Sequence, residues 1–270
     1  MESPLEDDFN DILKKAAQGL SLSTADLVAQ SGVDESSLKQ LFSGKLDESN
    51  LRKVAPLLGL CANALCLIAK NEWYPQKHTP AGLWQIPSVY GSMKVNAYLA
   101  KVPGTSEAIL FDTGTDASAI RTQLSKASLT LSAIFLTHTH SDHIAALGKL
   151  VAHMGQPVFY APAKEPIDGA SLLEHKSKID FGTLKVEARL THGHSRGGMS
   201  YIIKGLEPRL ITIVGDAIFA GSMGRGFISY NDALQSNKAE ILSLPPSTIL
   251  CPGHGPMTSV EEELEHNPFF

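Results

Sequence analysis

The sequence predicts an α/β sandwich preceded by a small all-α domain. Apolar residues recur at helical spacing up to about residue 70, and from residue 83 short apolar runs typical of strands alternate with helical segments. Side chains of the kinds that bind metals follow the ends of several predicted strands. We therefore expect an all-helical domain over residues 1–72, a linker over 73–82 and the sandwich over 83–270. The 270 residues are 43% hydrophobic and 19% charged, a composition that can bury a core.

The first 72 residues predict short helices around one small core. Ser23 or Thr24 can cap the second helix and Asp34 the third, because their side-chain oxygens accept hydrogen bonds from free amide groups. Gly32 lies in the turn between these two helices. The order of the helices resembles the helix-turn-helix of the phage-repressor (Cro/CI, or XRE) type.

The charge of this domain argues against DNA binding. Residues 1–70 contain seven Lys and Arg against ten Asp and Glu, whereas phosphates attract an excess of positive charge. The candidate recognition helix offers Lys39 and Gln40, but also Glu35. A helical cap, a dimerisation element or a protein-binding module is therefore preferred, and DNA binding through residues 1–72 stays an alternative.

The segments after the helical domain are predicted from their periodicity. Pro75 and Pro80 interrupt the helical pattern, so residues 73–82 predict a linker. Residues 184–190 alternate apolar and polar side chains, as a half-buried strand does. A polar stretch after residue 162 runs through His175. In order, the expected strands lie over residues 95–101, 107–111, 133–136, 157–162, 184–190, 209–214 and 248–251, and the expected helices over 117–127, 144–154 and 231–244.

The stretch THTHSDHI, residues 137–144, carries the strongest chemical signal. It places His138, His140, Asp142 and His143 within six positions, between a predicted strand and a predicted helix. Buried imidazoles and carboxylates need partners, so packing alone does not explain such a cluster. Alternate residues of the turn can point into one cavity, while the adjacent Asp–His pair faces a different direction. The turn can thus serve two metal ions.

Three more side chains of the same kinds follow predicted strands. They are His194, Asp216 and His254, and strand ends that share one edge of a sandwich can converge although they lie far apart in sequence. Zinc-like ions take imidazole and carboxylate ligands, and a catalytic site leaves one position for water.

The motifs identify a family by resemblance. The HxHxDH pattern resembles the metallo-β-lactamase superfamily, and GDAIFAGSMGR with CPGHGPMTSVEEELEHNPFF resembles its glyoxalase II-like branch, the hydroxyacylglutathione hydrolases and their shorter bacterial relatives. The resemblance covers about residues 90–270 and implies an αββα sandwich. It implies the following roles: first-metal ligands His138, His140 and His194; second-metal ligands Asp142, His143 and His254; Asp216 as the bridge; and Asp112 as a support beneath the ligands.

The resemblance implies a dinuclear metal-dependent hydrolase. Two divalent ions, with zinc preferred and iron or manganese as alternatives, would hold a metal-bound hydroxide that cleaves a thioester or another activated ester, including lactones. Asp142 and Asp216 are the expected catalytic carboxylates. His192 replaces a proline of the family pattern and is an alternative ligand, but His194 is preferred on the motif. Phe219-Ala220-Gly221 replaces the basic and tyrosyl residues of the family, so glutathione specificity is not expected. Whether Arg225 or His192 contacts substrate stays open.

Other functions compete with this one. A persulfide dioxygenase would hold a single iron on His138, His194 and Asp216, but those enzymes continue with Thr-Asp where this sequence has Gly226-Phe227. A transcriptional regulator would sense a ligand at the metal site and bind DNA through residues 1–72. β-Lactam hydrolysis is a further alternative that the glyoxalase-like ends argue against.

Charge and cysteine usage limit the partners. The net charge of −5 gives no attraction to nucleic acid or an anionic membrane, and no apolar segment is long enough to span a bilayer. The cysteines are Cys61, Cys66 and Cys251, an odd number without zinc-ribbon spacing, so a cytoplasmic protein is expected and a Cys61–Cys66 pair stays open. We expect a small-molecule substrate, and a homodimer is compatible with the sequence.

Overall fold

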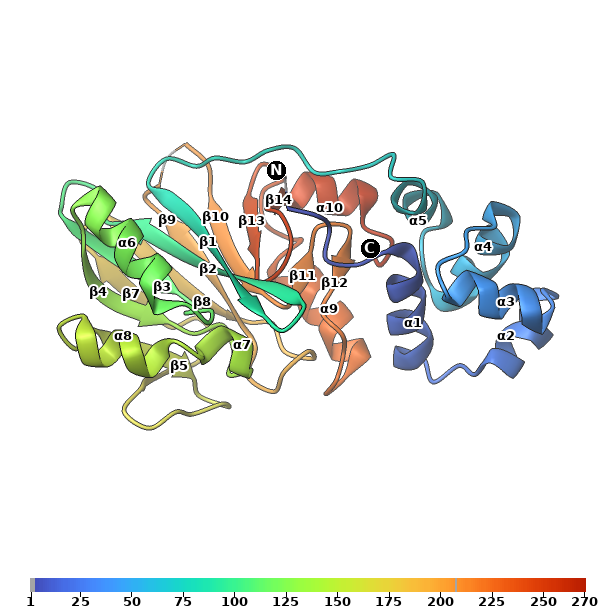
Figure 1. Cartoon of the computed structure of the whole chain (residues 1–270), viewed down its shortest axis with the longest axis horizontal. Coiled ribbons are helices and arrows are strands. Elements are labelled where there is room, and N and C mark those ends of the chain that lie inside the picture. Colours follow the sequence, from blue (N-terminus) through green and yellow to red (C-terminus); the bar gives the residue numbers. More distant parts are fainter. Residues whose placement is uncertain (1–2, 207) are drawn as a thin grey trace.

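The computed structural model describes residues 3–206 and 208–270. Two six-stranded mixed sheets lie face to face, with helices on their outer sides and the helical region at one end (Figure 1). The predicted fold class is confirmed. The first sheet has the order β1 (Leu83–Tyr90), β2 (Met93–Lys101), β3 (Glu107–Phe111), β4 (Thr130–Phe135), β5 (Val158–Pro162), β6 (Ser171–Leu173). The second has the order β14 (Thr258–Ser259), β13 (Ile249–Pro252), β10 (Ile211–Gly215), β9 (Met199–Lys204), β8 (Leu184–Leu190), β7 (Lys178–Phe181).

Apolar side chains from both sheets form the central core. Phe111 and Phe135 of the first sheet pack against Tyr201 of the second, with ring centroids 5.6 and 5.4 Å from the tyrosine ring. In β8 the predicted alternation holds, since Leu184 and Val186 are buried and Lys185 is exposed. Helices α6 (Ala117–Ala127) and α8 (Leu147–His153) cover the first sheet, and α9 (Tyr230–Glu240) with α10 (Val260–His266) lies beside the second.

Parallel pairing brings the functional loops to one edge. β3 and β4 run parallel, so the turn at Asp112 and the 137–144 stretch leave the first sheet on the same side. β10 and β13 also run parallel, which places the segments holding Asp216 and His254 together. The short helix α7 (Ser141–Ile144) follows β4 and carries Asp142 and His143.

Several elements were missed or misplaced by the sequence patterns. β6 and β7 are short edge strands in and just after the polar stretch, with too few residues to show a periodicity. β9, β14, α10 and the two-stranded hairpin of β11 (Ile218–Phe219) and β12 (Ser222–Met223) were also not predicted. The helix predicted over 231–244 ends at Glu240 and is followed by turns.

The helical region contains α1 (Phe9–Gly19), α2 (Thr24–Ser31), α3 (Glu35–Phe42), α4 (Glu48–Val54), the 3-10 helix η1 (Ala55–Leu58) and α5 (Ala62–Ala69). Ser23, not Thr24, caps α2, since its hydroxyl accepts a hydrogen bond from the Asp26 amide, and Asp34 caps α3. The described residues 70–82 contain no helix or strand. The boundaries at residues 72 and 83 stay a prediction.

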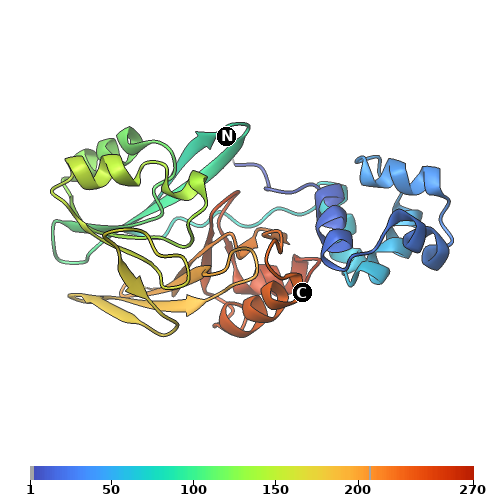
Figure 2. The same ribbon diagram turned by 90° about the horizontal axis from the view of Figure 1, so that it is seen from below.

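The helical region packs against the sandwich. Its core includes Met223, Tyr230 and Phe269 from the second half of the chain. The contact with α9 is close, because a Cβ on Gly19 would lie 2.3 Å from the Tyr230 ring. The Cys61 amide also donates a hydrogen bond to the Pro268 carbonyl at 2.8 Å. Figures 1 and 2 both show α1 beside this end of the sandwich.

A buried ion pair of the helical region contacts the sandwich. The Lys15 ammonium pairs with the Asp7 carboxylate, and both side chains are 9% exposed. Lys15 also donates to the Met223 carbonyl at 2.8 Å. Breaking a buried pair leaves an uncompensated charge, so Lys15→Met is expected to lower the free energy of unfolding by about 3 kcal/mol.

The neighbouring Lys14 supplies the matched control. Its side chain is 44% exposed and pairs with Asp11 on the surface of the same helix. Lys14→Met should therefore change the free energy of unfolding by no more than about 0.5 kcal/mol. Urea unfolding of both variants measures the difference, and equal midpoints would contradict the role of the buried pair.

The described cysteines are all free, so the Cys61–Cys66 pair that the sequence left open is not formed. No helix within the described part of the chain combines the length and the hydropathy needed to cross a membrane.

Candidate metal centre

Three imidazoles meet at the edge where the functional loops converge. His138 and His140 come from the turn after β4, and His194 from the loop between β8 and β9. The His140 Nδ1 atom lies 3.1 Å from His138 Nε2 and 3.0 Å from His194 Nε2. Each ring thus presents one nitrogen to the same point, an arrangement that suits a shared cation.

A second group lies beside the first. Asp142 and His143 lie in α7, and His254 follows β13. The Asp142 Oδ2 atom lies 3.5 Å from His143 Nε2 and 3.3 Å from His254 Nε2. His143 is fully buried, and the other two side chains are nearly so. The donor atoms of this group also lie within 4.8 Å of one another.

Asp216 lies between the two groups. Its Oδ1 atom is 3.2 Å from His143 Nε2, and its Oδ2 atom is 3.4 Å from both His194 Nε2 and His254 Nε2. One carboxylate therefore faces nitrogens of both groups, because its Oδ2 atom lies between His194 and His254 and its Oδ1 atom lies next to His143. This is the position that a bridging ligand takes.

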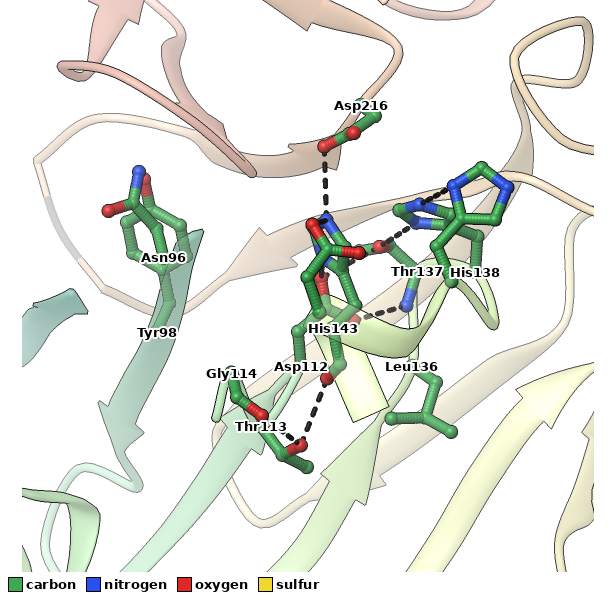
Figure 3. A network of polar contacts seen from close by, with 12 residues as sticks. Asn96, Tyr98, Asp112, Thr113, Gly114, Leu136, Thr137, His138, His143 and Asp216 are labelled. Atoms are coloured by element: carbon green, nitrogen blue, oxygen red, sulfur yellow. Dashed lines mark hydrogen bonds and ion pairs between the residues drawn. The ribbon is translucent and has the colours of Figure 1, made fainter. Parts of the chain in front are cut away.

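The remaining nitrogens of four rings are held by neighbouring groups. Asp112 accepts hydrogen bonds from His143 Nδ1 at 2.8 Å and from the amide and hydroxyl of Thr137 at 2.7 Å, and Thr137 Oγ1 lies 3.0 Å from His138 Nδ1 (Figure 3). His194 Nδ1 donates to the Arg225 carbonyl, and His254 Nδ1 to the Lys94 carbonyl. Such bonds fix the ring orientation and direct the opposite nitrogen toward a metal.

Two observations show that these residues fit divalent cations. Among the described residues, His143 Nε2 and Asp216 Oδ1 are buried polar atoms without a hydrogen-bond partner, although such atoms are nearly always satisfied. The site also depends on small residues, because a Cβ on Gly253 would lie 2.2 Å from Asp216 Oδ1. Imidazole and carboxylate donors suit zinc, iron and manganese.

Charges inside the site are strongly coupled. Burial lowers the pKa of His138 well below its usual value. Burial also opposes the charged form of His143, but the carboxylates of Asp216 and Asp112 outweigh it and raise the pKa of His143 to about 10. In the same way the pKa of His254 rises to about 11 against the effect of burial. Cations that bind here must displace these protons, so metal uptake and proton release are coupled.

The structure brings all seven predicted ligand residues together and leaves His192 outside. The His192 Nε2 atom lies 3.8 Å from Asp232 Oδ2 on α9. The Arg225 guanidinium lies 5.7 Å from the centre of the Phe227 ring, whereas its backbone carbonyl faces His194. The role of the seven as ligands stays a prediction.

Glu165 is a supporting residue that the sequence did not reveal. Its carboxylate accepts hydrogen bonds from the amide and hydroxyl of Thr139, both at 2.9 Å, and from the Gly197 amide at 2.6 Å. It therefore ties the loop of His138 and His140 to the loop of His194. A single Glu in a polar stretch carries no signal of such a contact.

Two facing mixed sheets with His and Asp groups at one edge define an α/β sandwich with a candidate metal centre. The chain belongs to the Metallo-beta-lactamase superfamily, whose family profile matches residues 90–254. The helical region lies outside this match, which therefore gives no support to its helix-turn-helix resemblance. Members of this superfamily bind metal ions, and the His and Asp groups described above are consistent with that.

Among curated relatives, the chain is similar to the "Probable metallo-hydrolase YqgX" of Bacillus subtilis, with 30% identity over 202 residues that cover 66% of this chain and 93% of the relative. It is also similar to a "Hydroxyacylglutathione hydrolase" of Halorhodospira halophila, with 32% identity over 164 residues, or 58% of this chain and 60% of the relative.

Solved structures show the same likeness. The BLEG-1 B3 metallo-β-lactamase superposes with a TM-score of 0.61 and 32% identity, covering 69% of this chain and 98% of that one. ETHE1 from Myxococcus xanthus superposes with a TM-score of 0.61 and 25% identity, covering 68% of this chain and 83% of that one. TTHA1623 in a di-iron-bound form superposes with a TM-score of 0.56 and 27% identity, covering 68% of this chain and 99% of that one.

Proposed function

We propose that this protein is a dinuclear metal-dependent hydrolase of thioesters or other activated esters, including lactones. The observation that carries the proposal is the position of Asp216, whose two oxygens lie 3.2–3.4 Å from imidazole nitrogens of both groups. His138, His140 and His194 would hold one ion, and Asp142, His143 and His254 the other. Zinc is the first expectation, with iron or manganese as alternatives.

Different residues of the protein would have different roles in this reaction. Divalent ions, when bound, lower the pKa of a coordinated water and polarise a carbonyl group. Asp216 would set the spacing of the two ions, and Asp142, buried beside it, would orient a water through its second oxygen. Asp112 and the backbone carbonyls of Lys94 and Arg225 would hold the imidazole rings of the proposed ligands in their orientations.

The relatives define a substrate panel. The hydroxyacylglutathione hydrolase name indicates thioesters, and the likeness to BLEG-1 adds a β-lactam. With metal-loaded protein, hydrolysis of short acyl thioesters and lactones is expected to exceed hydrolysis of a chromogenic β-lactam, and chelation followed by added zinc should abolish and then restore it. Hydrolysis of none of these substrates by the metal-loaded protein would contradict the proposal.

A persulfide dioxygenase is the second candidate. The likeness to ETHE1 favours it, and His138, His194 and Asp216 also lie together here. Oxygen uptake by the iron-loaded protein with glutathione persulfide would put this reaction first. The complete second group of Asp142, His143 and His254 favours the hydrolase.

The helical region is expected not to bind DNA. On the exposed face of α3 the Lys39 ammonium lies 2.6 Å from the Glu35 carboxylate, which neutralises the cation nearest to the candidate recognition surface. Fluorescence anisotropy with random duplex at low salt should show no binding at micromolar protein. Salt-sensitive binding in that range would instead support a regulator.

A further inference from the structure

The N-terminal arm, defined here as residues 3–8, runs beside the metal centre before it enters α1. Figure 1 shows it crossing the end of the sandwich near β14. The arm lies close to the loop that carries His254, because a Cβ on Gly255 would lie 3.3 Å from the Glu6 amide nitrogen and 3.6 Å from the Pro4 carbonyl oxygen. The arm thus belongs to the surroundings of the second group of ligands.

Buried polar contacts hold the arm in this place. The Asp7 carboxylate accepts hydrogen bonds from the Lys15 ammonium and from the Ser222 hydroxyl. The Lys15 ammonium also lies 5.0 Å from the centre of the Phe219 ring, and that ring packs edge-on at 5.6 Å against His254. The arm, α1 and the β11–β12 hairpin after Asp216 are therefore fixed to one another.

This arrangement brings the Glu6 carboxylate behind a predicted ligand. Its Oε2 atom lies 3.9 Å from His254 Nδ1, the nitrogen that donates to the Lys94 carbonyl at 2.7 Å. The opposite nitrogen, Nε2, faces Asp142 and Asp216. The side chain of His254 is 5% exposed and that of Glu6 is 23% exposed, so water screens the interaction only in part.

We propose that Glu6 is a positioning residue for the second metal ion, carried to the site by the helical region. A negative charge on the outer side of a ligand imidazole strengthens that ring as a metal donor and favours its orientation. The inference rests on the proposed dinuclear function. The helical region then forms part of the surroundings of the metal centre, although the family match does not include that region.

The test replaces Glu6 with Gln in the full chain, a change that keeps the shape and removes the charge. Competition with a chromophoric chelator measures the affinity for each equivalent of Zn²⁺. The second equivalent should bind about three- to tenfold more weakly, less than the loss typical of a directly hydrogen-bonded carboxylate, and the first should be unchanged. Asp8→Asn is the matched control, because Asp8 is an exposed carboxylate on the same arm, and both equivalents should bind as in the wild type.

The outcomes separate the possible failures. Unchanged affinity for both equivalents in Glu6→Gln would overturn the role of Glu6 and leave the dinuclear hydrolase intact. Equal weakening of both equivalents, or a similar effect of Asp8→Asn, would show a general charge effect and overturn it too. A wild-type protein that takes up only one ion would overturn the proposed function together with this inference. Thermal midpoints of the metal-free variants should match the wild type.

Discussion

Replacing Asp216 with Ala is expected to abolish metal binding and hydrolysis together. The carboxylate is the only group among the described residues whose oxygens face both the His138–His140–His194 group and the Asp142–His143–His254 group. Its loss would remove a proposed ligand from each ion, together with a negative charge that would offset two cations in a buried site. The activity, measured as kcat/KM, should fall by about a thousandfold or more, because the activated water is lost with the ions.

Metal content and hydrolysis of the best substrate should be measured on the same preparation. Asp180→Ala is the control, since Asp180 is an exposed residue of the edge strand β7 in the same sheet. That variant should keep its metal and its activity. An Asp216→Ala protein with wild-type hydrolysis would refute the assigned bridge.

Replacing Asp112 with Asn should weaken the metal centre without removing any predicted ligand. Asp112 is 2% exposed and accepts three hydrogen bonds, from His143 Nδ1 and from the amide and hydroxyl of Thr137. Its φ of +53° is a left-handed conformation that Asn also adopts, so the backbone should be kept. In the variant, the NH₂ group of the Asn side chain would face an N–H or O–H group that now donates a hydrogen bond to the Asp112 carboxylate.

Two quantities should change in this variant. Affinity for zinc should fall by about 10- to 100-fold, as for other residues that orient a metal-binding histidine. The free energy of unfolding of the metal-free protein should fall by about 2 kcal/mol, because a buried donor loses its acceptor.

Asp116→Asn separates the two effects. Asp116 caps α6 through the Ser118 amide at 2.8 Å and takes no part in the metal centre. That variant should lose some stability and keep its zinc affinity. An Asp112→Asn protein that binds zinc as tightly as the wild type would contradict the orienting role.

Residues that repeat a chemical type at short spacing were predictable from the sequence. His138, His140, Asp142 and His143 stand within one turn, and imidazoles and carboxylates at such spacing have few structural explanations. His194, Asp216 and His254 were proposed because each follows a predicted strand, and the parallel pair β10–β13 brings the ends that precede Asp216 and His254 together.

Residues that act through tertiary contacts were not predictable. Lys14 and Lys15 look alike in the sequence, yet only Lys15 is buried, because the side of α1 that faces the sandwich is set by packing. Glu165 and Glu6 are single carboxylates in polar segments, and their contacts with Gly197 and His254 span large separations in sequence. The short strands β6 and β7 depend on pairing with neighbours more than on their own composition.

The most direct test of the dinuclear centre is the metal content of protein purified without chelator or added metal, measured by plasma mass spectrometry. The account predicts close to two ions per chain, mainly zinc or a mixture of zinc and iron, one for each of the two neighbouring groups of proposed ligands. Close to one iron per chain with little zinc would contradict it and would make oxygen uptake with a persulfide the next assay.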